Sequence, residues 1–521
     1  MPKNTNSQKM TRRSRVLSVL LTLVFCALFT VSIVNVAMPS IQKALGASSA
    51  DLQWVVSGYS LTFGVMLVAA GRMGDLFGRA EFFMLGAAVF GLSSLVATFA
   101  PNMLVLNIAR AFMGVGAGIF NPQVSSMIQQ NYRGFERARA FAALGAVVGL
   151  GVAVGPVLGG VLLAWLPESW AWRTTLGINI PFALVAIILG YLWLPRNNAY
   201  ISKSGEIVPE GTPWGAQARV DQGTQTGSEH AGSVQTASQP RSVQPVKKVK
   251  DFDPIGALIL GLTILTLMTP FIHNNGNNAI FSLIGVATLL LIVWLMWEHF
   301  YEKRGHVPMV DLRLFKVPSF SIGAALITVW FAGTTSVWII LAMFIQQGLG
   351  YSPLVSGTIG LPGAILTSVS SIIAGRVMVK WGRKTILFGI IGTIISMLLA
   401  IWATVAATQG HSILWITAAF TVQGFTGGFV NSPNQAFTLQ DVPVSQGGTA
   451  SGIMQTGQRV ATAVGVAMVT GLFFQQVPFG YAKAVTAAYL LIIAFMSIAL
   501  VLGLMDLTLE KKYKFGDVQV A

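Results

Sequence analysis

Charged side chains are scarce in this chain. Asp, Glu, Lys and Arg together make up 10% of its 521 residues, whereas soluble proteins contain roughly 25%. Hydrophobic residues make up 54%, and apolar runs of about 20 residues, the length that a bilayer core requires, recur along most of the sequence. A water-soluble globular fold is therefore excluded, and we expect an all-α integral membrane protein.

The sequence also lacks the alternation of polar and apolar residues that is typical of membrane β-strands, which excludes a β-barrel. The long apolar runs predict fourteen transmembrane helices instead. We expect these spans near residues 16–38, 52–71, 82–100, 103–122, 139–164, 175–194, 255–272, 279–297, 318–346, 355–378, 385–407, 411–430, 448–472 and 484–505.

Cysteine and histidine are almost absent. Cys26 is the single cysteine, so a disulfide within the monomer and a cysteine metal cluster are both excluded. The five histidines form no Ser/His/Asp grouping and show no metal-ligand spacing. We therefore predict no enzyme, no metal and no cofactor.

Acidic residues number 18 against 33 Lys and Arg, which gives a net charge of +15. With an even number of spans and the N-terminus inside, three basic residues face outward (Lys43, Arg173 and Lys483) and two lie within spans (Arg110 and Arg459). The other 28 fall in cytoplasmic segments, the pattern that orients helices in a membrane. We expect a multi-pass protein of the plasma membrane with both termini cytoplasmic, inner-leaflet anionic lipid as a partner, and no nucleic acid.

Two strings of residues recur at similar offsets. The string Gly-Arg-x5-Gly-Arg occupies residues 71–79 and returns at residues 375–383, 304 positions later, and residues 113–121 resemble residues 423–431, 310 positions later. Spans 9–14 therefore correspond to spans 1–6, and spans 7 and 8 form an insert. A membrane protein with two similar halves is most often a transporter that rocks one half against the other.

The predicted organisation is two pseudo-symmetric six-helix bundles plus an inserted two-helix hairpin. Residues 195–250 are rich in Gly, Ser, Gln, Thr and Pro and show no periodicity, which favours a disordered cytoplasmic tether; a docking or regulatory segment is the alternative. The expected parts are an N-terminal cytoplasmic tail (1–15), the first bundle (16–194), the linker (195–250), the hairpin (251–300), a cytoplasmic loop (301–317), the second bundle (318–505) and a C-terminal cytoplasmic tail (506–521).

The repeated string predicts a conformational latch. Its glycines allow a tight reversal of the chain, and its charged residues can form pairs that exist in one state and break in another. Val379 stands where the first copy has Asp75, so a full latch is expected only in the first half; an ordinary positively charged turn is the alternative. The gating residues would be Gly71, Arg72, Gly74, Asp75, Gly78 and Arg79 in the first copy, and Gly375, Arg376, Gly382 and Arg383 in the second.

Span 4 carries Arg110, Gly114, Gly118 and Asn121 on one helical face. A charge at the centre of a membrane helix costs about 2.5–3.5 kcal/mol, so Arg110 should face the bundle interior or a watery cavity, unless it snorkels to the interface. Span 5 is rich in glycine and contains one proline, which indicates close helix packing or a bend between the halves. These residues are Gly145, Gly149, Gly151, Gly155, Pro156, Gly159 and Gly160.

Together these motifs resemble the major facilitator superfamily, specifically its fourteen-helix drug:proton antiporter branch. The resemblance is carried by residues 71–79, 110–122, 145–160, 32–39 and 311–315, and it covers nearly all of the chain except its ends and the linker. It implies a central cavity between two helical domains and alternating access. It also implies that Asp75 with Arg72 and Arg79 forms a gate, that Arg110 is a proton-relay or cavity residue, and that Gly155-Pro156 belongs to the antiporter motif.

The chain departs from that branch in one respect. The branch usually has an acidic residue five positions before Asn35, where this chain has Thr30, and all 18 acidic residues fall in loops, tails or span ends. With Arg110 and Arg459 in the membrane and no acidic partner evident, we expect a neutral to positive cavity and a neutral or anionic amphiphilic substrate. The candidate cavity residues are Thr30, Asn35, Arg110, Asn121, Trp330, Trp338, Gln346, Gln347, Asn431, Gln455, Gln458 and Arg459, although the tryptophans could instead face lipid.

The function expected from these patterns is a secondary active transporter that exports drug-like or amphiphilic small molecules, with protons as the coupling ion. One alternative is a transporter of a neutral or anionic physiological solute or lipid that protons do not drive. Another is a membrane receptor or scaffold that transports nothing, although the linker does not resemble the large soluble domain that such a protein would carry.

Overall fold

The computed structural model describes residues 5–196, 200–201, 207–208, 253–272, 278–306 and 308–512. The first group of helices comprises α1 (Thr5–Leu45), α2 (Ser49–Phe77), α3 (Arg79–Thr98), α4 (Met103–Asn131), α5 (Gly134–Trp165), α6 (Glu168–Gly177) and α7 (Asn179–Trp193). The hairpin comprises α9 (Pro254–Ile272), the short 3-10 turn η1 (Asn278–Phe281) and α10 (Ser282–Lys303). The last group comprises η2 (Leu312–Lys316), α11 (Pro318–Met343), the π-turn η3 (Phe344–Gly348), α12 (Pro353–Trp381), α13 (Lys384–Thr408), α14 (Leu414–Thr438), η4 (Val444–Gln446), α15 (Gly447–Gln476), η5 (Val477–Phe479) and α16 (Tyr481–Lys512).

Thirteen spans among the described residues are long and apolar enough to cross a membrane, with α6 and α7 counted as one. The expected fourteenth is α14, whose 25 residues include polar side chains such as Gln423, Asn431 and Gln435 that lower its mean hydropathy. The predicted all-helical membrane fold is confirmed. A ribbon of two short antiparallel strands, β1 (Tyr200–Ile201) and β2 (Ile207–Val208), falls inside the expected linker, and the rest of that linker lies largely outside the described residues.

Several helices extend beyond the apolar runs that predicted them. α1 begins at Thr5, inside the expected N-terminal tail, α10 continues to Lys303, and α16 continues to Lys512, inside the expected C-terminal tail. An apolar run marks the hydrocarbon core only, whereas a helix continues through the polar interface because its backbone hydrogen bonds do not depend on side-chain polarity. This correction places Glu298 and Asp506 within helices.

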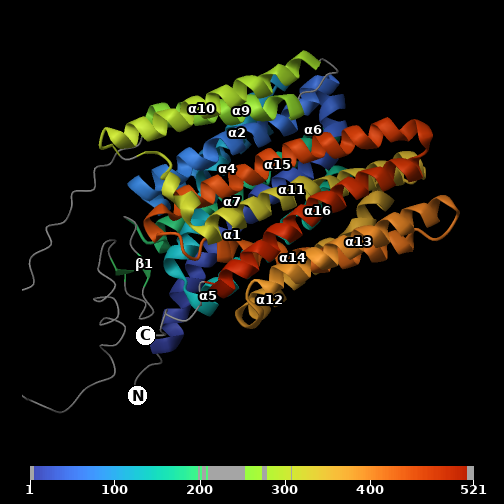
Figure 1. Ribbon diagram of the computed structural model, residues 1–521. Coiled ribbons are helices and arrows are strands. Elements are labelled where there is room, and N and C mark those ends of the chain that lie inside the picture. The colour runs from blue at the N-terminus through green and yellow to red at the C-terminus, as the bar shows by residue number, and fades with distance from the viewer. Residues whose placement is uncertain are drawn as a thin grey trace, which may run out of the picture.

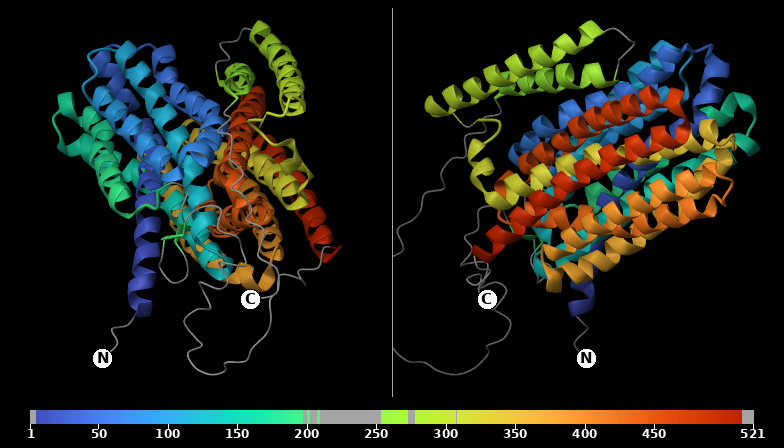
Figure 2. Two further views of the ribbon diagram at one scale, coloured as in Figure 1. Left: turned by 90° about the vertical axis from the view of Figure 1, so that its left-hand side faces the viewer. Right: turned by 45° about the vertical axis from the view of Figure 1, so that its right-hand side comes forward.

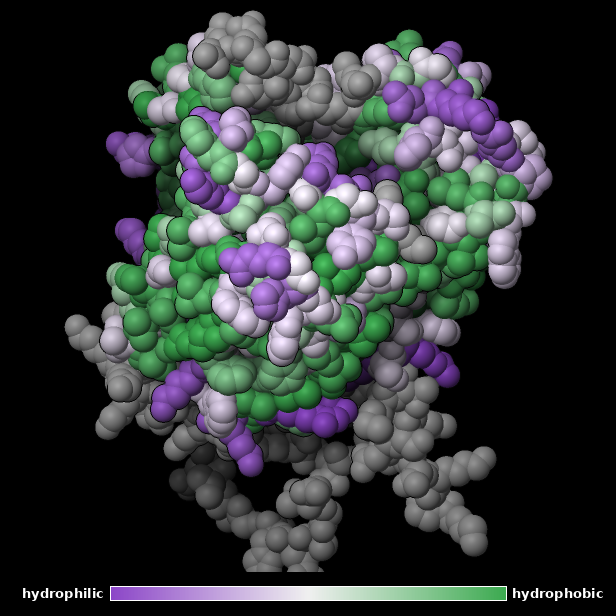
Figure 3. Space-filling model, turned by 90° about the vertical axis from the view of Figure 1, so that its right-hand side faces the viewer, coloured by the Kyte–Doolittle hydropathy of each residue, from purple (hydrophilic) through white to green (hydrophobic). Residues whose placement is uncertain are grey.

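The helices lie side by side, and the start of α1 and the end of α16 lie at the same end of the molecule (Figures 1 and 2). We call this end the terminal face and the other end the opposite face. Figure 3 looks onto the opposite face, where hydrophilic residues gather in patches surrounded by hydrophobic ones. That distribution suits a protein whose flanks contact lipid and whose ends contact water.

The packing of α1–α7 is repeated by α11–α16. α2 packs on α4 as α12 packs on α14, α3 packs on α4 as α13 packs on α14, and α1 packs on α5 as α11 packs on α15. Between the two groups, α2 packs on α15 and α5 packs on α12, while α9 packs on both α2 and α15 (Figure 2). The hairpin therefore lies against one of the two seams between the groups.

Candidate functional site

Asp75, on the last turn of α2, joins the two groups of helices at the terminal face. Its Oδ1 accepts hydrogen bonds from Nε and Nη2 of Arg79, at 3.1 and 2.8 Å, and from the backbone N–H of Gly448 at 3.0 Å. Its Oδ2 accepts bonds from the N–H and the hydroxyl of Thr449, at 2.9 and 3.2 Å. Because Gly448 and Thr449 begin α15, the carboxylate caps a helix N-terminus, where negative charge is stabilised.

The arginines and glycines of the first string complete this contact, which we call the latch. Arg79 is buried and also donates from Nη2 to the carbonyl of Val444, beyond the seam. A Cβ added at Gly71 would lie 2.2 Å from the carbonyl oxygen of Gly448, so only glycine lets α2 approach α15 this closely. Gly74 packs in the same way on Gln123 of α4, and Gly78 has a φ of 121°, which lets the chain reverse between α2 and α3.

Two glutamines reinforce the closure at the terminal face, and a third supports the first group beside it. Gln129 of α4 donates from Nε2 to the carbonyls of Leu439 and Val442, at 2.7 and 2.9 Å. Gln435 of α14 donates to the Ser125 hydroxyl of α4 at 2.7 Å. The third, Gln123, donates to the carbonyl of Ala70 within the first group. Sequence reasoning missed these residues, because their partners lie far away in the chain and are backbone carbonyls or, for Gln435, a serine hydroxyl, none of which belongs to a motif.

The second copy of the string is built differently. Gly375 packs on Ala142 of α5, Arg376 is exposed, and Gly382 adopts a φ of 54°. Arg383 is buried, forms an ion pair with Asp506 of α16 and lies 5.6 Å from the centre of the Phe437 ring. All three of these residues belong to the second group, so the charged pair of this copy holds one bundle together, whereas its Gly375 contacts the other group. Asp506 was missed because the apolar run before it ends at residue 505.

We expect Asp506→Asn to destabilise the second bundle without altering the latch, because it leaves the buried Arg383 without its carboxylate. Removing one partner of a buried pair typically costs about 3–5 kcal/mol. The midpoint temperature of unfolding in detergent should fall clearly below that of the parent and of Asp441→Asn, an exposed acid of the same face. Equal midpoints for the two variants would show that the pair contributes nothing to stability.

The glycines of α5 pack against α12 and α14 of the second group on one side and against α1 of the first group on the other. Near the terminal face, Gly145 lies against Ser432 and Ser371, and Gly149 against Ser368. Further along, three glycines pack on α1: Gly151 on Phe25 and Leu28, Gly155 on Ser32, and Gly159 on Ile33, whereas Gly160 faces open space. α5 is one continuous helix through position 156, and the side chain of Pro156 lies outside the described residues.

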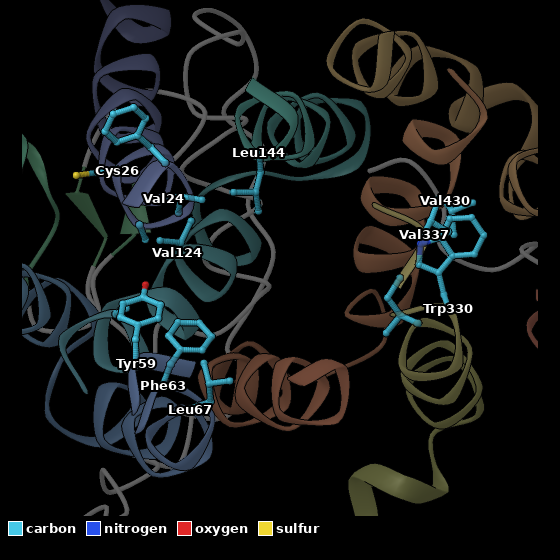
Figure 4. Packing of buried hydrophobic residues seen from close by; sticks show 14 of the residues in the cluster. Val24, Cys26, Tyr59, Phe63, Leu67, Val124, Leu144, Trp330, Val337 and Val430 are labelled. Atoms are coloured by element: carbon cyan, nitrogen blue, oxygen red, sulfur yellow. The ribbon is translucent and has the colours of Figure 1, made fainter. Parts of the chain in front are cut away.

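The two predicted intramembrane arginines meet on one face of α2. Arg110 lies with its guanidinium carbon 4.6 Å from the centre of the Tyr59 ring, and Arg459 lies 4.3 Å from the centre of the Phe63 ring. The two rings are stacked at 6.1 Å and 12°, one helical turn apart (Figure 4). We call these four residues the arginine–aromatic stack; it brings together α4, α2 and α15.

Neither guanidinium of the stack pairs with a carboxylate in the described part of the chain. Arg110 is 1% exposed, so it does not snorkel to the interface, and its Nε donates to the carbonyl of Val55 at 2.9 Å. Arg459 is half-buried, and its guanidinium lies over the face of Phe63. The site therefore carries positive charge against aromatic surface, an arrangement that suits an anionic or aromatic ligand.

The other candidate cavity residues do not converge on this stack. Thr30 is buried within the first group and donates to Oδ1 of Asn179 at 2.5 Å and to the carbonyl of Cys26 at 2.7 Å. Gln455 is buried and donates to Ser451. The remaining candidates are exposed (Asn35, Gln346 and Gln347), half-buried (Asn121, Asn431, Gln458 and Trp338) or buried (Trp330).

The two candidate tryptophans, Trp330 and Trp338, do not face lipid as the alternative interpretation suggested. Trp330 is 4% exposed and lies near Val337 and Val430 inside the second group (Figure 4). Trp338 packs on Phe420 of α14 with ring centres 5.5 Å apart. Both side chains therefore fill space between helices. Asn179, which accepts hydrogen bonds from Thr30 and Cys26, was not anticipated, because the break between α6 and α7 beside it is invisible in the apolar pattern.

Comparison with known proteins identifies this architecture. A family model described as Major Facilitator Superfamily matches residues 20–239 and 255–466. The chain belongs to the Major Facilitator Superfamily. Among related proteins, the probable actinorhodin transporter of Streptomyces coelicolor is 27% identical over 468 residues, which cover 89% of this chain and 73% of that protein. The riboflavin transporter RibZ of Clostridioides difficile is 25% identical over 472 residues, which cover 90% of each chain.

Solved structures agree in fold. The human organic anion transporter MFSD10 superposes with a TM-score of 0.64 at 14% identity, covering 94% of this chain and 99% of that one. The proton:xylose symporter XylE superposes with a TM-score of 0.61 at 15% identity, covering 98% and 96%. The protein is thus a major facilitator transporter of the multidrug-efflux type, since its relatives include multidrug and puromycin resistance proteins, and it is not an enzyme.

Proposed function

We propose that this transporter exports neutral or anionic amphiphilic molecules by alternating access between two six-helix bundles, residues 16–194 and 318–505. The observation that carries the proposal is the latch. It joins the bundles at the terminal face through groups that a relative rotation would separate, as a gate requires. The present structure corresponds to the state that is closed at this face.

The charge distribution supports an orientation for this gate. The start of α1 and the end of α16 lie at the terminal face (Figure 1), and the sequence pattern assigns most of the basic residues to segments on that side. Positive segments remain in the cytoplasm, where inner-leaflet anionic lipid can bind them. We therefore place the latch at the cytoplasmic side of the plasma membrane, so that the closed state faces outward and opening admits the substrate from inside.

The arginine–aromatic stack supports the choice of substrate class. Its two guanidinium groups lack acidic partners among the described residues, and its rings offer aromatic surface to a planar ligand. Related transporters are named for organic compounds of several kinds, including actinorhodin, riboflavin, cephamycin and puromycin. A site that recognises charge and aromatic surface fits such breadth better than a rigid polar pocket would.

We expect Arg459→Gln to reduce export of an anionic dye far more than export of a neutral one. In everted vesicles, transport of fluorescein should fall about tenfold, the effect of losing about 1.4 kcal/mol of binding energy, while transport of riboflavin changes little. Arg304→Gln is the matched control, because Arg304 also lies over a phenylalanine ring but is exposed and remote from the stack. If ethidium, a permanent cation, competes well with fluorescein in the parent protein, the proposed substrate class is wrong.

Coupling to protons is part of the proposal, and one observation favours a second candidate. No acidic residue lies at the middle of a described helix, so the usual competition between a proton and a cation for one carboxylate cannot operate there. The second candidate is therefore a facilitator that moves its solute down a gradient. An uncoupler decides between them in the same vesicles: coupled export stops, whereas facilitated movement continues.

A further inference from the structure

A buried carboxylate outside the latch and the arginine–aromatic stack lies near the terminal end of α10. Glu298 is 1% exposed, and no side chain among the described residues donates a hydrogen bond to its carboxylate oxygens. It lies beside the backbone of Met309 and Val310, in the connection between α10 and α11. A buried ionised carboxylate that has only neighbouring backbone groups to compensate its charge is costly, whereas the neutral acid is tolerated.

The residues that cover Glu298 come from both bundles. Met309 and Val310 form a hydrophobic cluster with Val68 of α2 and Trp294 of α10, and Ile453 of α15 packs against it. Because α2 and α15 belong to different bundles, separating the bundles at the terminal face must open this cluster. Water would then reach Glu298, so its burial depends on the state of the latch. This step rests on the alternating access proposed above.

Two charged groups act on Glu298 from neighbouring elements: Asp253 at the start of α9 and Arg72 of the latch string on α2. Asp253 is well provided with donors, since it accepts bonds from the N–H of Gly256 at 2.9 Å and from the indole of Trp297 at 3.0 and 3.2 Å. Of the two buried acids, Glu298 has the weaker set of donors, because no side chain donates to it and only the backbone of Met309 and Val310 lies beside it. A proton in this region is therefore needed at Glu298 and not at Asp253.

A cavity of about 260 Å³ at the terminal face supplies a route for that proton. Its lining includes Met309, whose backbone lies beside Glu298, and Arg72, whose charge acts on Glu298. Four titratable groups of the α10–α11 region also line it, namely Glu302, His306, Asp311 and Arg313. Glu302 is paired with Arg313, and Asp311 accepts a bond from Gln446 at 3.1 Å. The facing residue of α15, Ile453, is apolar and cannot exchange protons.

We propose that Glu298 binds a proton from the terminal-face solvent when the latch closes and releases it there when the latch opens. The carboxylate takes up one proton as it becomes buried and returns it as it becomes hydrated, so no other reactant is required. The sign follows from this linkage: acid at the terminal face stabilises the closed state, and alkali favours opening. The hairpin thereby makes the gate sensitive to pH, although no carboxylate lies at the middle of a helix that the structure describes.

A thiol reporter tests this without any substrate. Ser126 of α4 is 0% exposed and lies against Gly447 of α15, so it becomes accessible only when the latch opens. In a Cys26→Ser background, Ser126→Cys provides a single thiol whose labelling by a membrane-impermeant maleimide can be timed in everted vesicles. Glu298→Gln, added to this parent, mimics the protonated acid at every pH.

The informative quantity is the ratio of labelling rates, parent over Glu298→Gln, because the thiol chemistry is the same in both proteins. We expect a ratio near one at about pH 6 that rises to about tenfold by about pH 8.5, as a one-proton linkage predicts. When Glu302→Gln or His306→Asn is made in the parent, the labelling rate relative to Glu298→Gln should still rise with pH, because Glu298 is unchanged in both variants. A ratio that stays near one throughout, while the thiol is labelled, overturns the proton site and leaves the proposed transport intact.

Two further outcomes are decisive. If Glu298→Gln lowers the amount of protein in the membrane, Glu298→Met replaces it. Methionine has a similar volume and is uncharged at every pH, so the ratio of labelling rates, parent over Glu298→Met, must rise with pH in the same way, and a ratio that stays near one refutes the site. If the parent thiol is not labelled at any pH, the latch does not open, which overturns alternating access at this face and with it the inference drawn from it.

Discussion

Asp75→Asn is expected to lower transport at least about tenfold and to leave the terminal face open for most of the cycle. The carboxylate is buried and accepts bonds from Arg79, Gly448 and Thr449, so an amide in its place would turn an N–H₂ group toward one set of donors. Breaking a buried charged pair costs about 3–5 kcal/mol. A closed state weakened by about 3 kcal/mol would be populated about 100-fold less relative to the open one.

Two measurements check this expectation. Export of fluorescein from everted vesicles should fall, and the thiol at position 126 should be labelled much faster than in the parent, because the residues that cover it separate. Asp441→Asn removes the same charge from an exposed position on the same face and should change neither value. Normal transport with slow labelling in Asp75→Asn would show that the latch does not control opening.

The amino-acid sequence predicted the latch residues but not what they hold. Asp75 and Arg79 belong to a string that recurs, and their spacing of four along a chain entering a helix makes their pairing a local property. Their partners beyond the seam are backbone groups of Gly448, Thr449 and Val444. Every residue has such groups, so only the three-dimensional arrangement shows which ones meet the latch.

The membrane helices were predictable because their length follows from bilayer thickness, but their ends were not. Apolar runs stop where water begins, whereas the helices α10 and α16 continue for further turns. That difference hides two buried acids, Glu298 and Asp506, which the apolar pattern places at a span end and in a tail although both side chains are buried. A polar residue just past an apolar run, on the same helical face as buried neighbours, is the signal that could have found them.

The meeting of Arg110 and Arg459 shows what the internal repeat can and cannot convey. Each arginine was noticeable because intramembrane charge is rare, yet the two occupy unrelated positions in the two halves. They approach one another only because α2 lies between α4 and α15 and presents Tyr59 and Phe63 on one face. The repeat predicts which helices correspond, but the seam between the bundles decides which side chains share a site.

Arg110→Ala is accordingly expected to abolish transport while the amount of protein in the membrane stays near normal. The guanidinium holds the carbonyl of Val55 and the face of Tyr59, which in turn stacks on Phe63 beneath Arg459. Loss of this guanidinium removes one of the two positive charges of the stack and the group that packs on the Tyr59 ring. Export of fluorescein by everted vesicles, scaled to protein abundance, measures the effect.

Two matched variants separate charge from shape at this position. Arg110→Lys keeps the positive charge but not the planar fork that donates to Val55 and stacks on the ring, so partial activity is expected, between that of the parent and that of Arg110→Ala. Tyr59→Phe keeps the ring and should transport nearly as well as the parent, because the stack uses the face of the ring and not the hydroxyl.

The stack depends on contact between the bundles. Arg110 joins α4 to α2 within the first bundle, whereas Arg459 reaches α2 from the second. The two arginines therefore report on a site that exists only while α2 and α15 remain packed. Unchanged transport in Arg110→Ala would remove this residue, and the stack with it, from the transport mechanism.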